Sequence, residues 1–271
     1  MIRITVIMGI YNCADTLVEA LESLEAQTYR KFKVVMCDDG SSDETLVIAK
    51  KWAETHANYL VIQNERNMKL AATLNHCLEY ADTEYVARMD GDDISLPSRF
   101  EKEVEILDKH PEYALVSCPM VFFDETGDFR TGEAVEKPTP KDFLKGTPFC
   151  HAPVMVRTSV YKEVGGYTIG EKTERMEDYY LWYKIYKKGY VGYNLSEPLY
   201  KMRDDRKARM RRISLKRRWI GLKTDIEVAK GLGLESPYYY PIFHFCAGLF
   251  AQILPYEVYK YMRSKFHKSQ I

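Results

Sequence analysis

The sequence predicts an α/β protein with a mostly parallel central sheet flanked by helices and a helical C-terminal extension. Two observations support this: four short apolar runs rich in β-branched residues punctuate the first ninety residues, and helical periodicity separates them. Such alternation implies parallel strands joined by crossover helices that cover the sheet. With 271 residues, 46% of them hydrophobic, the chain can bury one large core.

Each element of this half follows from a local pattern. The predicted strands are Ile4–Met8, Phe32–Cys37, Tyr59–Ile62 and Tyr85–Met89. The apolar stripes of the intervening helices are Leu17, Ala20, Leu21 and Leu24, then Leu46, Ala49 and Ala53, then Leu70, Leu74, Cys77 and Leu78. Ser41-Ser42-Asp43-Glu44 has the pattern of a capping box before the second helix.

Polar residues follow every predicted strand, at the edge of the sheet where α/β proteins bind ligands. They are Tyr11 and Asn12, Asp38-Asp39-Gly40, Asn64 and Asn67, and Asp90-Gly91-Asp92-Asp93. Turn formation explains an isolated Asp-Gly pair, but recurrence on successive strands favours one shared site rich in carboxylates.

Two common phosphate-binding motifs are missing from the sequence. No G-x-G-x-x-G follows the first strand and no G-x-x-x-x-G-K-[ST] occurs, which argues against a dinucleotide oxidoreductase or a P-loop enzyme. A diphosphate can instead be bound through Mg²⁺ or Mn²⁺, and Asp90 and Asp92 supply the oxygen ligands that these ions prefer.

Over residues 2–205 the chain resembles the inverting family 2 glycosyltransferases, whose nucleotide-sugar-binding half has the GT-A fold. The matching segments are Thr5-Val-Ile-Met-Gly-Ile-Tyr-Asn12, Ser23-Leu-Glu-Ala-Gln-Thr-Tyr29, Asp38-Asp-Gly-Ser-Ser-Asp43, Ala87-Arg-Met-Asp-Gly-Asp-Asp93 and Glu177-Asp-Tyr-Tyr-Leu-Trp182. The resemblance implies residues 1–110 as the donor-binding half and 111–205 as the acceptor-binding and catalytic-base half of one domain, with 206–271 as a basic, aromatic extension.

The resemblance also implies roles for single residues around the nucleotide. Ile10 and Tyr11 lie against the base, Asp39 accepts a hydrogen bond from it, Asp90 sits near the ribose, Asn67 and Arg88 face the nucleotide, and Asp92 is the metal ligand. Helix or turn capping is the alternative for Asp39, and packing at the sheet edge is the alternative for Tyr11. Arg88 could equally pair with a neighbouring carboxylate.

A second acidic centre, Glu177-Asp178, opens a helical stripe. Acidic residues are common at helix starts, because the helix dipole favours them there. The resemblance assigns Asp178 as the catalytic base and Glu177 as its supporting neighbour. A base on one side of the sugar and a metal-bound diphosphate on the other would give inversion in one displacement.

Three further residues resemble family positions less closely. His151 corresponds to a position on the acceptor side, although a lone His is more often structural. Arg203 could pair with phosphate. Asp205 stands where many relatives have a His that reaches metal or diphosphate, and an Asp could also ligate a cation.

The expected function is transfer of a hexose or N-acetylhexosamine from a nucleotide sugar, which we expect to be UDP-linked, to a glycan or lipid-linked oligosaccharide in cell-surface polysaccharide synthesis. A sugar-nucleotide nucleotidyltransferase is an alternative, but its Gly-rich basic loop after the first strand is missing. A non-catalytic carbohydrate-binding relative is another, and the intact Asp90, Asp92 and Asp178 argue against it.

The charge distribution separates residues 1–200, the body, from residues 201–271, the tail. Residues 201–271 contain 16 Lys or Arg and six Asp or Glu, so their +10 is balanced by −10 in residues 1–200, which argues against a nucleic-acid partner for the body. Ser236–Tyr256 is uncharged but interrupted by Pro241 and Pro255. We expect docking at a membrane surface; packing on the chain's own body or on a second copy in a homodimer is the alternative.

The cysteines and the N-terminus indicate the compartment. The six cysteines form no C-x-x-C pair, which argues against a zinc knuckle and a dense disulfide framework and favours a reducing environment. No signal-peptide pattern precedes Ile4. We therefore expect a cytoplasmic protein, peripheral at the inner face of the cell membrane.

Overall fold

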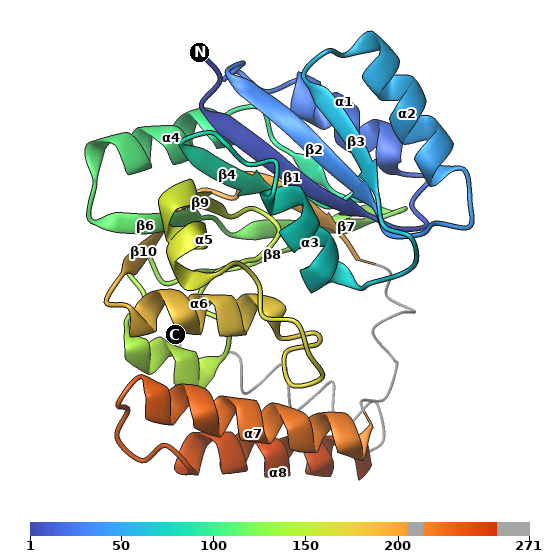
Figure 1. Cartoon of the computed structure of the whole chain (residues 1–271). Helices are drawn as coiled ribbons and strands as arrows, with labels where there is room; N and C mark the ends of the chain where they lie inside the picture. The colour runs from blue at the N-terminus through green and yellow to red at the C-terminus, as the bar shows by residue number, and fades with distance from the viewer. Residues whose placement is uncertain (205–213, 254–271) are drawn as a thin grey trace. The chain divides into compact units, whose positions relative to one another are not determined.

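A computed structural model describes residues 1–204 and 214–253, with the side chains of 250–253 left out. The chain divides into two compact units, Met1–Arg209 and Met210–Ile271 (Figure 1). The first unit is a mixed α/β body and the described part of the second, residues 214–253, is helical, as the sequence predicts. The candidate metal ligand Asp205 lies outside the described residues.

The central sheet of the first unit has seven strands in the order β10-β6-β9-β4-β1-β2-β3. Their bounds are β1 Ile4–Ile10, β2 Phe32–Asp38, β3 Tyr59–Gln63, β4 Tyr85–Arg88, β6 Tyr113–Ser117, β9 Met155–Arg157 and β10 Val191–Asn194. The first four strands are mutually parallel, which confirms the prediction for this half. Only β9 among these seven strands is antiparallel to its neighbours, β4 and β6.

A second sheet has four strands in the order β5-β11-β7-β8. Their bounds are β5 Ile94–Ser95, β7 Met120–Asp124, β8 Gly127–Thr131 and β11 Tyr200–Arg203. Strand β5 follows the acidic Asp90–Asp93 run directly, and β11 pairs with it in antiparallel register, Tyr200 opposite Ser95. This pairing brings β11 beside the acidic run.

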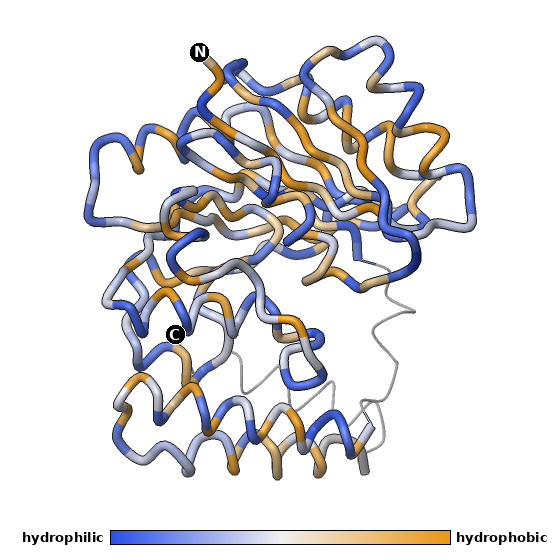
Figure 2. Tube along the Cα trace, in the orientation of Figure 1, coloured by the Kyte–Doolittle hydropathy of each residue, from blue (hydrophilic) through white to orange (hydrophobic). Residues whose placement is uncertain are grey.

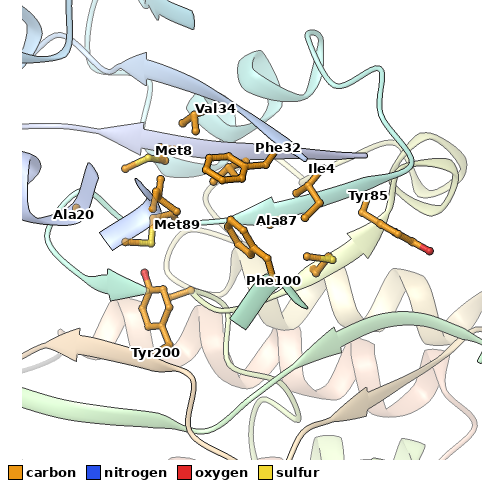
Figure 3. Packing of buried hydrophobic residues seen from close by; sticks show 14 of the residues in the cluster. Ile4, Met8, Ala20, Phe32, Val34, Tyr85, Ala87, Met89, Phe100 and Tyr200 are labelled. Carbon is orange, nitrogen blue, oxygen red and sulfur yellow. The ribbon is translucent and has the colours of Figure 1, made fainter. Parts of the chain in front are cut away.

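Helices cover both faces of the central sheet (Figure 1). They are α1 Leu17–Glu25, α2 Thr45–Thr55, α3 Leu70–Leu78, α4 Arg99–Lys109, α5 Thr158–Val164 and α6 Glu177–Lys187, with a 3₁₀ helix at Pro140–Lys145. Alternate residues of β1, such as Ile4 and Met8, pack in one core cluster with Phe100 of α4 (Figure 3). Figure 2 shows apolar stretches along the central strands, while many of the connecting loops are polar. The stripe Leu17, Ala20, Leu21 and Leu24 is fully buried, as predicted.

The predicted capping box before α2 is wrong. The N-cap residue is Glu44, and its side chain makes no capping hydrogen bond. The two serines are instead engaged by Asn12, whose N–H donates to Ser41 Oγ at 3.0 Å and whose Oδ1 accepts from the Ser42 N–H at 2.8 Å. Asp43 Oδ1 accepts from the Thr45 N–H at 3.0 Å, so the carboxylate satisfies the helix start.

The second unit contains α7 Leu215–Gly231 and α8 Tyr239–Ile253, which pack against each other. Ser214 caps α7, because its Oγ accepts from the Arg217 N–H at 3.2 Å. Trp219 and Phe245 meet edge to face with ring centroids 5.4 Å apart. Neither these helices nor any other described helix is long and apolar enough to cross a membrane.

Candidate active site

The carboxyl ends of four neighbouring parallel strands assemble the site. Ile10 at the end of β1 pairs with Asp38 of β2, and Asp38 pairs with Gln63 of β3. The residues that follow these strands are therefore adjacent in space, although Tyr11 and Asp90, for example, are 79 positions apart in sequence. Ile10 is fully buried, whereas the Tyr11 side chain is 49% exposed beside it, free to meet a ligand.

Asp39 holds the loop that joins β3 to α3. Its Oδ1 accepts from Asn64 Nδ2 at 2.8 Å and from the Met68 N–H at 2.7 Å, and its Oδ2 accepts from the Lys69 N–H at 2.9 Å. Asp39 is 4% exposed, so these bonds satisfy a buried charge. Asn67 lies exposed within the loop that the carboxylate organises.

The acidic run after β4 is fixed from several sides. Arg88 is almost fully buried and forms an ion pair with Asp90, so the pairing alternative for Arg88 is the observed geometry. The Asp90 N–H donates to the Tyr200 hydroxyl at 3.1 Å. The Gly91 carbonyl accepts from Thr16 Oγ1 at 3.0 Å. These contacts set the backbone of the run before any ligand binds.

Strand β11 completes this environment through Arg203. Its backbone N–H donates to Asp93 Oδ1 at 2.8 Å, and its guanidinium donates to the Asp92 carbonyl at 3.0 Å and pairs with Glu19. The Arg203 side chain is thus engaged with protein groups around the acidic run. Its predicted contact with phosphate would have to be made from this position.

The electrostatics of the acidic run favour a cation. The Asp92 side chain is accessible to solvent, yet desolvation by the packed residues around it, together with the charge of Asp90, raises its pKa. Burial and the charges of Asp90 and Asp92 raise the pKa of Asp93 further. A divalent cation would relieve this repulsion, and hard carboxylate oxygens are its preferred ligands. No set of three or more His, Cys, Asp or Glu in the described residues is arranged to hold a metal.

The second acidic centre opens α6. Burial raises the pKa of Asp178, an effect that the Tyr179 N–H and the charge of Arg88 partly offset. Burial also raises the pKa of Glu177, whose Oε2 has no hydrogen-bond partner. A carboxylate held at a helix start with a raised pKa is suited to accept a proton near neutral pH. The field of Arg88 acts on both acidic centres, so one buried guanidinium connects them electrostatically.

His151 lies in an aromatic cluster beside this centre. Its Nε2 is 2.9 Å from the Tyr167 hydroxyl, and its ring meets Trp182 at a centroid distance of 6.1 Å. Burial, reinforced by the charge of Arg88, lowers the pKa of His151 well below its usual value. The imidazole is therefore neutral at physiological pH, and its predicted role in acceptor binding would rest on hydrogen bonding rather than charge.

Sequence reasoning missed two supporting residues. Tyr200 holds the Asp90 backbone, and Asn75 of α3 makes two hydrogen bonds to Tyr167 across the domain. Asn64, which the sequence places at the strand ends without a role of its own, holds Asp39. Tyr200 and Asn75 act on partners about ninety or more residues away, and no local pattern marks such pairs.

Comparison with known proteins adds independent information. The sequence model of the family described as Glycosyl transferase family 2 matches residues 5–165. The chain is 46% identical over 211 residues to the putative glycosyltransferase EpsE of Bacillus subtilis, covering 78% of this chain and 76% of EpsE. It is 30% identical to the amylovoran biosynthesis glycosyltransferase AmsE of Erwinia amylovora, covering 97% and 99% of the two chains.

Among solved structures, residues 1–349 of S. aureus TarS in complex with UDP-GlcNAc have a similar fold. The TM-score is 0.71 at 20% identity, and the match covers 94% of this chain and 77% of that one. The similarity confirms the predicted GT-A architecture.

Proposed function

Because the chain belongs to glycosyl transferase family 2, we propose that it transfers a hexose or N-acetylhexosamine from a UDP-sugar to a glycan or lipid-linked oligosaccharide, with a divalent cation and inversion at the anomeric carbon. Its family and its relatives identify the chain as a glycosyltransferase of bacterial polysaccharide synthesis. The donor, acceptor, cation and stereochemistry are the proposed parts.

A uracil base suits Asp39, because its ring N–H can donate a hydrogen bond to the carboxylate. A carboxylate offers about four acceptor positions, and the described bonds to the loop use three of them. The remaining position can accept the uracil N–H, while the exposed ring of Tyr11 can cover the base. The complex of TarS with UDP-GlcNAc supports this choice of nucleotide.

Asp92, with Asp90 beside it, would hold Mn²⁺ or Mg²⁺. When bound, this ion supplies Lewis-acid stabilisation of the leaving nucleotide diphosphate. Arg88 and Tyr200 keep Asp90 and its backbone in place for this role. Asp205, outside the described residues, is proposed as a further ligand.

Asp178 would accept the proton of the acceptor hydroxyl as that oxygen attacks the anomeric carbon. Its raised pKa makes it a stronger base than an ordinary Asp. Glu177 would help to orient the substrate from the adjacent position, and His151 would line the acceptor side. The observation that carries the proposal is the presence of two acidic centres, one at the strand ends and one on α6, under the influence of the same Arg88.

A screen of UDP-, GDP- and dTDP-sugars for nucleotide release tests the proposal. We expect UDP release that requires Mn²⁺ or Mg²⁺ and stops in chelator. Turnover of GDP- or dTDP-sugars alone would refute the uracil assignment, and full activity in chelator would refute the cation.

We also propose that the second unit docks on an anionic membrane surface. Exposed Lys216, Trp219, Lys223 and Lys230 follow one another at helical spacing on α7. Exposed aromatic and aliphatic side chains, including Tyr239, Ile242 and Phe243, lie on α8. Basic and aromatic groups together are typical of helices that lie in a membrane interface, where a lipid-linked acceptor would be found.

A further inference from the structure

A cavity of about 260 Å³ lies between the start of α3 and the segment that leads to α6. Its lining includes Met68, Lys69 and Ala72 on one side and Ile169, Thr173 and Glu177 on the other. The first side continues from the loop that Asp39 holds, and the second ends at the acidic centre of α6. The cavity therefore lies beside the loop that Asp39 holds and is also lined by Glu177, the neighbour of the proposed base Asp178.

Lys69 has an unusual backbone conformation at this cavity. Its φ of 69° and ψ of 161° fall in a region that is essentially restricted to glycine. The Asp39 carboxylate holds it there through the Lys69 N–H at 2.9 Å. Such strain persists only where the surrounding structure imposes it, and it concentrates at functional sites. A glycine would adopt this conformation freely, so the side chain of Lys69 must account for its presence.

That side chain reaches across the cavity. Lys69 Nζ is 2.9 Å from Glu174 Oε1, and the two side chains are 63% and 31% exposed. Glu174 is three residues before Glu177. The ion pair therefore joins the Asp39-held loop to the segment that delivers the acidic centre. An exposed pair of this kind contributes little to stability, so it can be broken at small energetic cost.

The segment itself spans residues 165–176 and is held together by its own hydrogen bonds. Gly165 and Gly166 both have positive φ at its start, and Arg175 has a φ of 64° at its end. Thr173 is 1% exposed, and its Oγ1 donates to the Thr168 carbonyl at 2.7 Å, which keeps the middle compact. Asn75 secures the start through its two bonds to Tyr167, so Lys69 is placed to secure the end.

We propose that Lys69 is a positioning residue: by pairing with Glu174 it keeps segment 165–176 closed over the cavity, which takes the sugar of the bound donor. This rests on the proposed function, since the occupant is the sugar of a UDP-sugar. Glu177 lines this cavity, and its Oε2 is buried with no hydrogen-bond partner.

Hydrogen exchange of the full-length protein without ligand tests directly whether the Lys69–Glu174 ion pair holds the segment. In Lys69→Gln, amide exchange in residues 167–176 should rise by up to about fivefold, the range expected for an exposed ion pair. The charge swap Lys69→Glu with Glu174→Lys should restore slow exchange. Lys145→Gln, which removes a similarly exposed pair with Asp142, should leave the segment unchanged. Unchanged exchange in Lys69→Gln would overturn the proposal.

Lys69→Gly separates strain from charge. Glycine relieves the backbone strain, so the midpoint of thermal unfolding should not fall, yet exchange of residues 167–176 should rise as in Lys69→Gln. Slow exchange in Lys69→Gly would show that the backbone, not the ammonium, holds the segment, and would overturn the proposal.

Calorimetry with UDP and UDP-GlcNAc then tests the occupant. In Lys69→Gln we expect unchanged affinity for UDP and up to about fivefold weaker binding of UDP-GlcNAc. If the variant shows altered exchange but binds UDP and UDP-GlcNAc each as tightly as wild type does, closure over the sugar is wrong. If wild type binds neither ligand, the proposed donor is wrong, while the exchange result still decides whether Lys69 holds the segment.

Discussion

Replacing Asp178 by Asn removes the proposed proton acceptor with little change in shape. We expect transfer to be almost abolished while UDP binding is retained, because the nucleotide is held at Asp39 and the acidic run after β4. The helix should persist: an anionic side chain in the first turn contributes only about 0.3–1 kcal/mol, and burial already disfavours the charge of Asp178.

The expected loss of rate in Asp178→Asn follows from the role of Asp178 as a general base. A positioned general base typically contributes about 10²–10⁴-fold, and about 1.4 kcal/mol corresponds to each tenfold change. Since burial raises the pKa of Asp178 toward the working pH, we expect a loss in the upper part of that range. The barrier should therefore rise by about 4–5 kcal/mol.

The assay is nucleotide release from the donor under saturating conditions, combined with calorimetric measurement of UDP affinity. Asp128→Asn is the matched control, because it makes the same change on β8 at an exposed carboxylate that pairs with Lys201. An Asp178→Asn enzyme with near-normal turnover, or one that loses UDP affinity in proportion to its activity, would refute the assignment of the base.

Three further predictions follow from the same geometry. Asp92→Ala should lose metal-dependent turnover, seen as no response to added Mn²⁺; activity equal to wild type in chelator would exclude Asp92 as the ligand. The acidic limb of the pH profile of kcat should lie above the usual pKa of Asp, and Arg88→Gln should move it to higher pH because Arg88 lowers the pKa of Asp178; a limb that stays in place would contradict this. The full-length protein should sediment with anionic liposomes at low salt, and Lys216→Glu with Lys223→Glu should abolish this, unlike the same changes at exposed Lys50 and Lys51; equal sedimentation of both variants would exclude docking through α7.

Local periodicity predicts the donor half of the fold well. Strands β1 to β4 occur where the apolar runs place them, and helices α1 and α3 occur where the stripes of Leu17–Leu24 and Leu70–Leu78 place them. Each of these patterns depends only on residues that are close in sequence. The antiparallel insertion of β9 between β4 and β6 was not predictable in this way. It depends on pairing between Val156 and strands about forty and seventy residues before it, which no local pattern encodes.

In the candidate site, too, features set by nearby residues were predictable from the sequence and features set by distant residues were not. The position of Asp39 after β2 is readable from the sequence, but its bonds to the backbone of Met68 and Lys69 depend on how a distant loop folds back. The Arg88–Asp90 pair could be anticipated because the two residues are close in sequence. The hold of Tyr200 on Asp90 could not, since 110 residues separate them.

The stereochemistry of the first-formed product tests the central claim most directly. A UDP-sugar with an α-linked sugar can be hydrolysed by the enzyme without an acceptor and followed by proton NMR before the anomers equilibrate. Single displacement from a UDP-sugar, with water taking the place of the acceptor hydroxyl, predicts that the β-anomer forms first. Initial formation of the α-anomer would contradict inversion and with it the proposed mechanism.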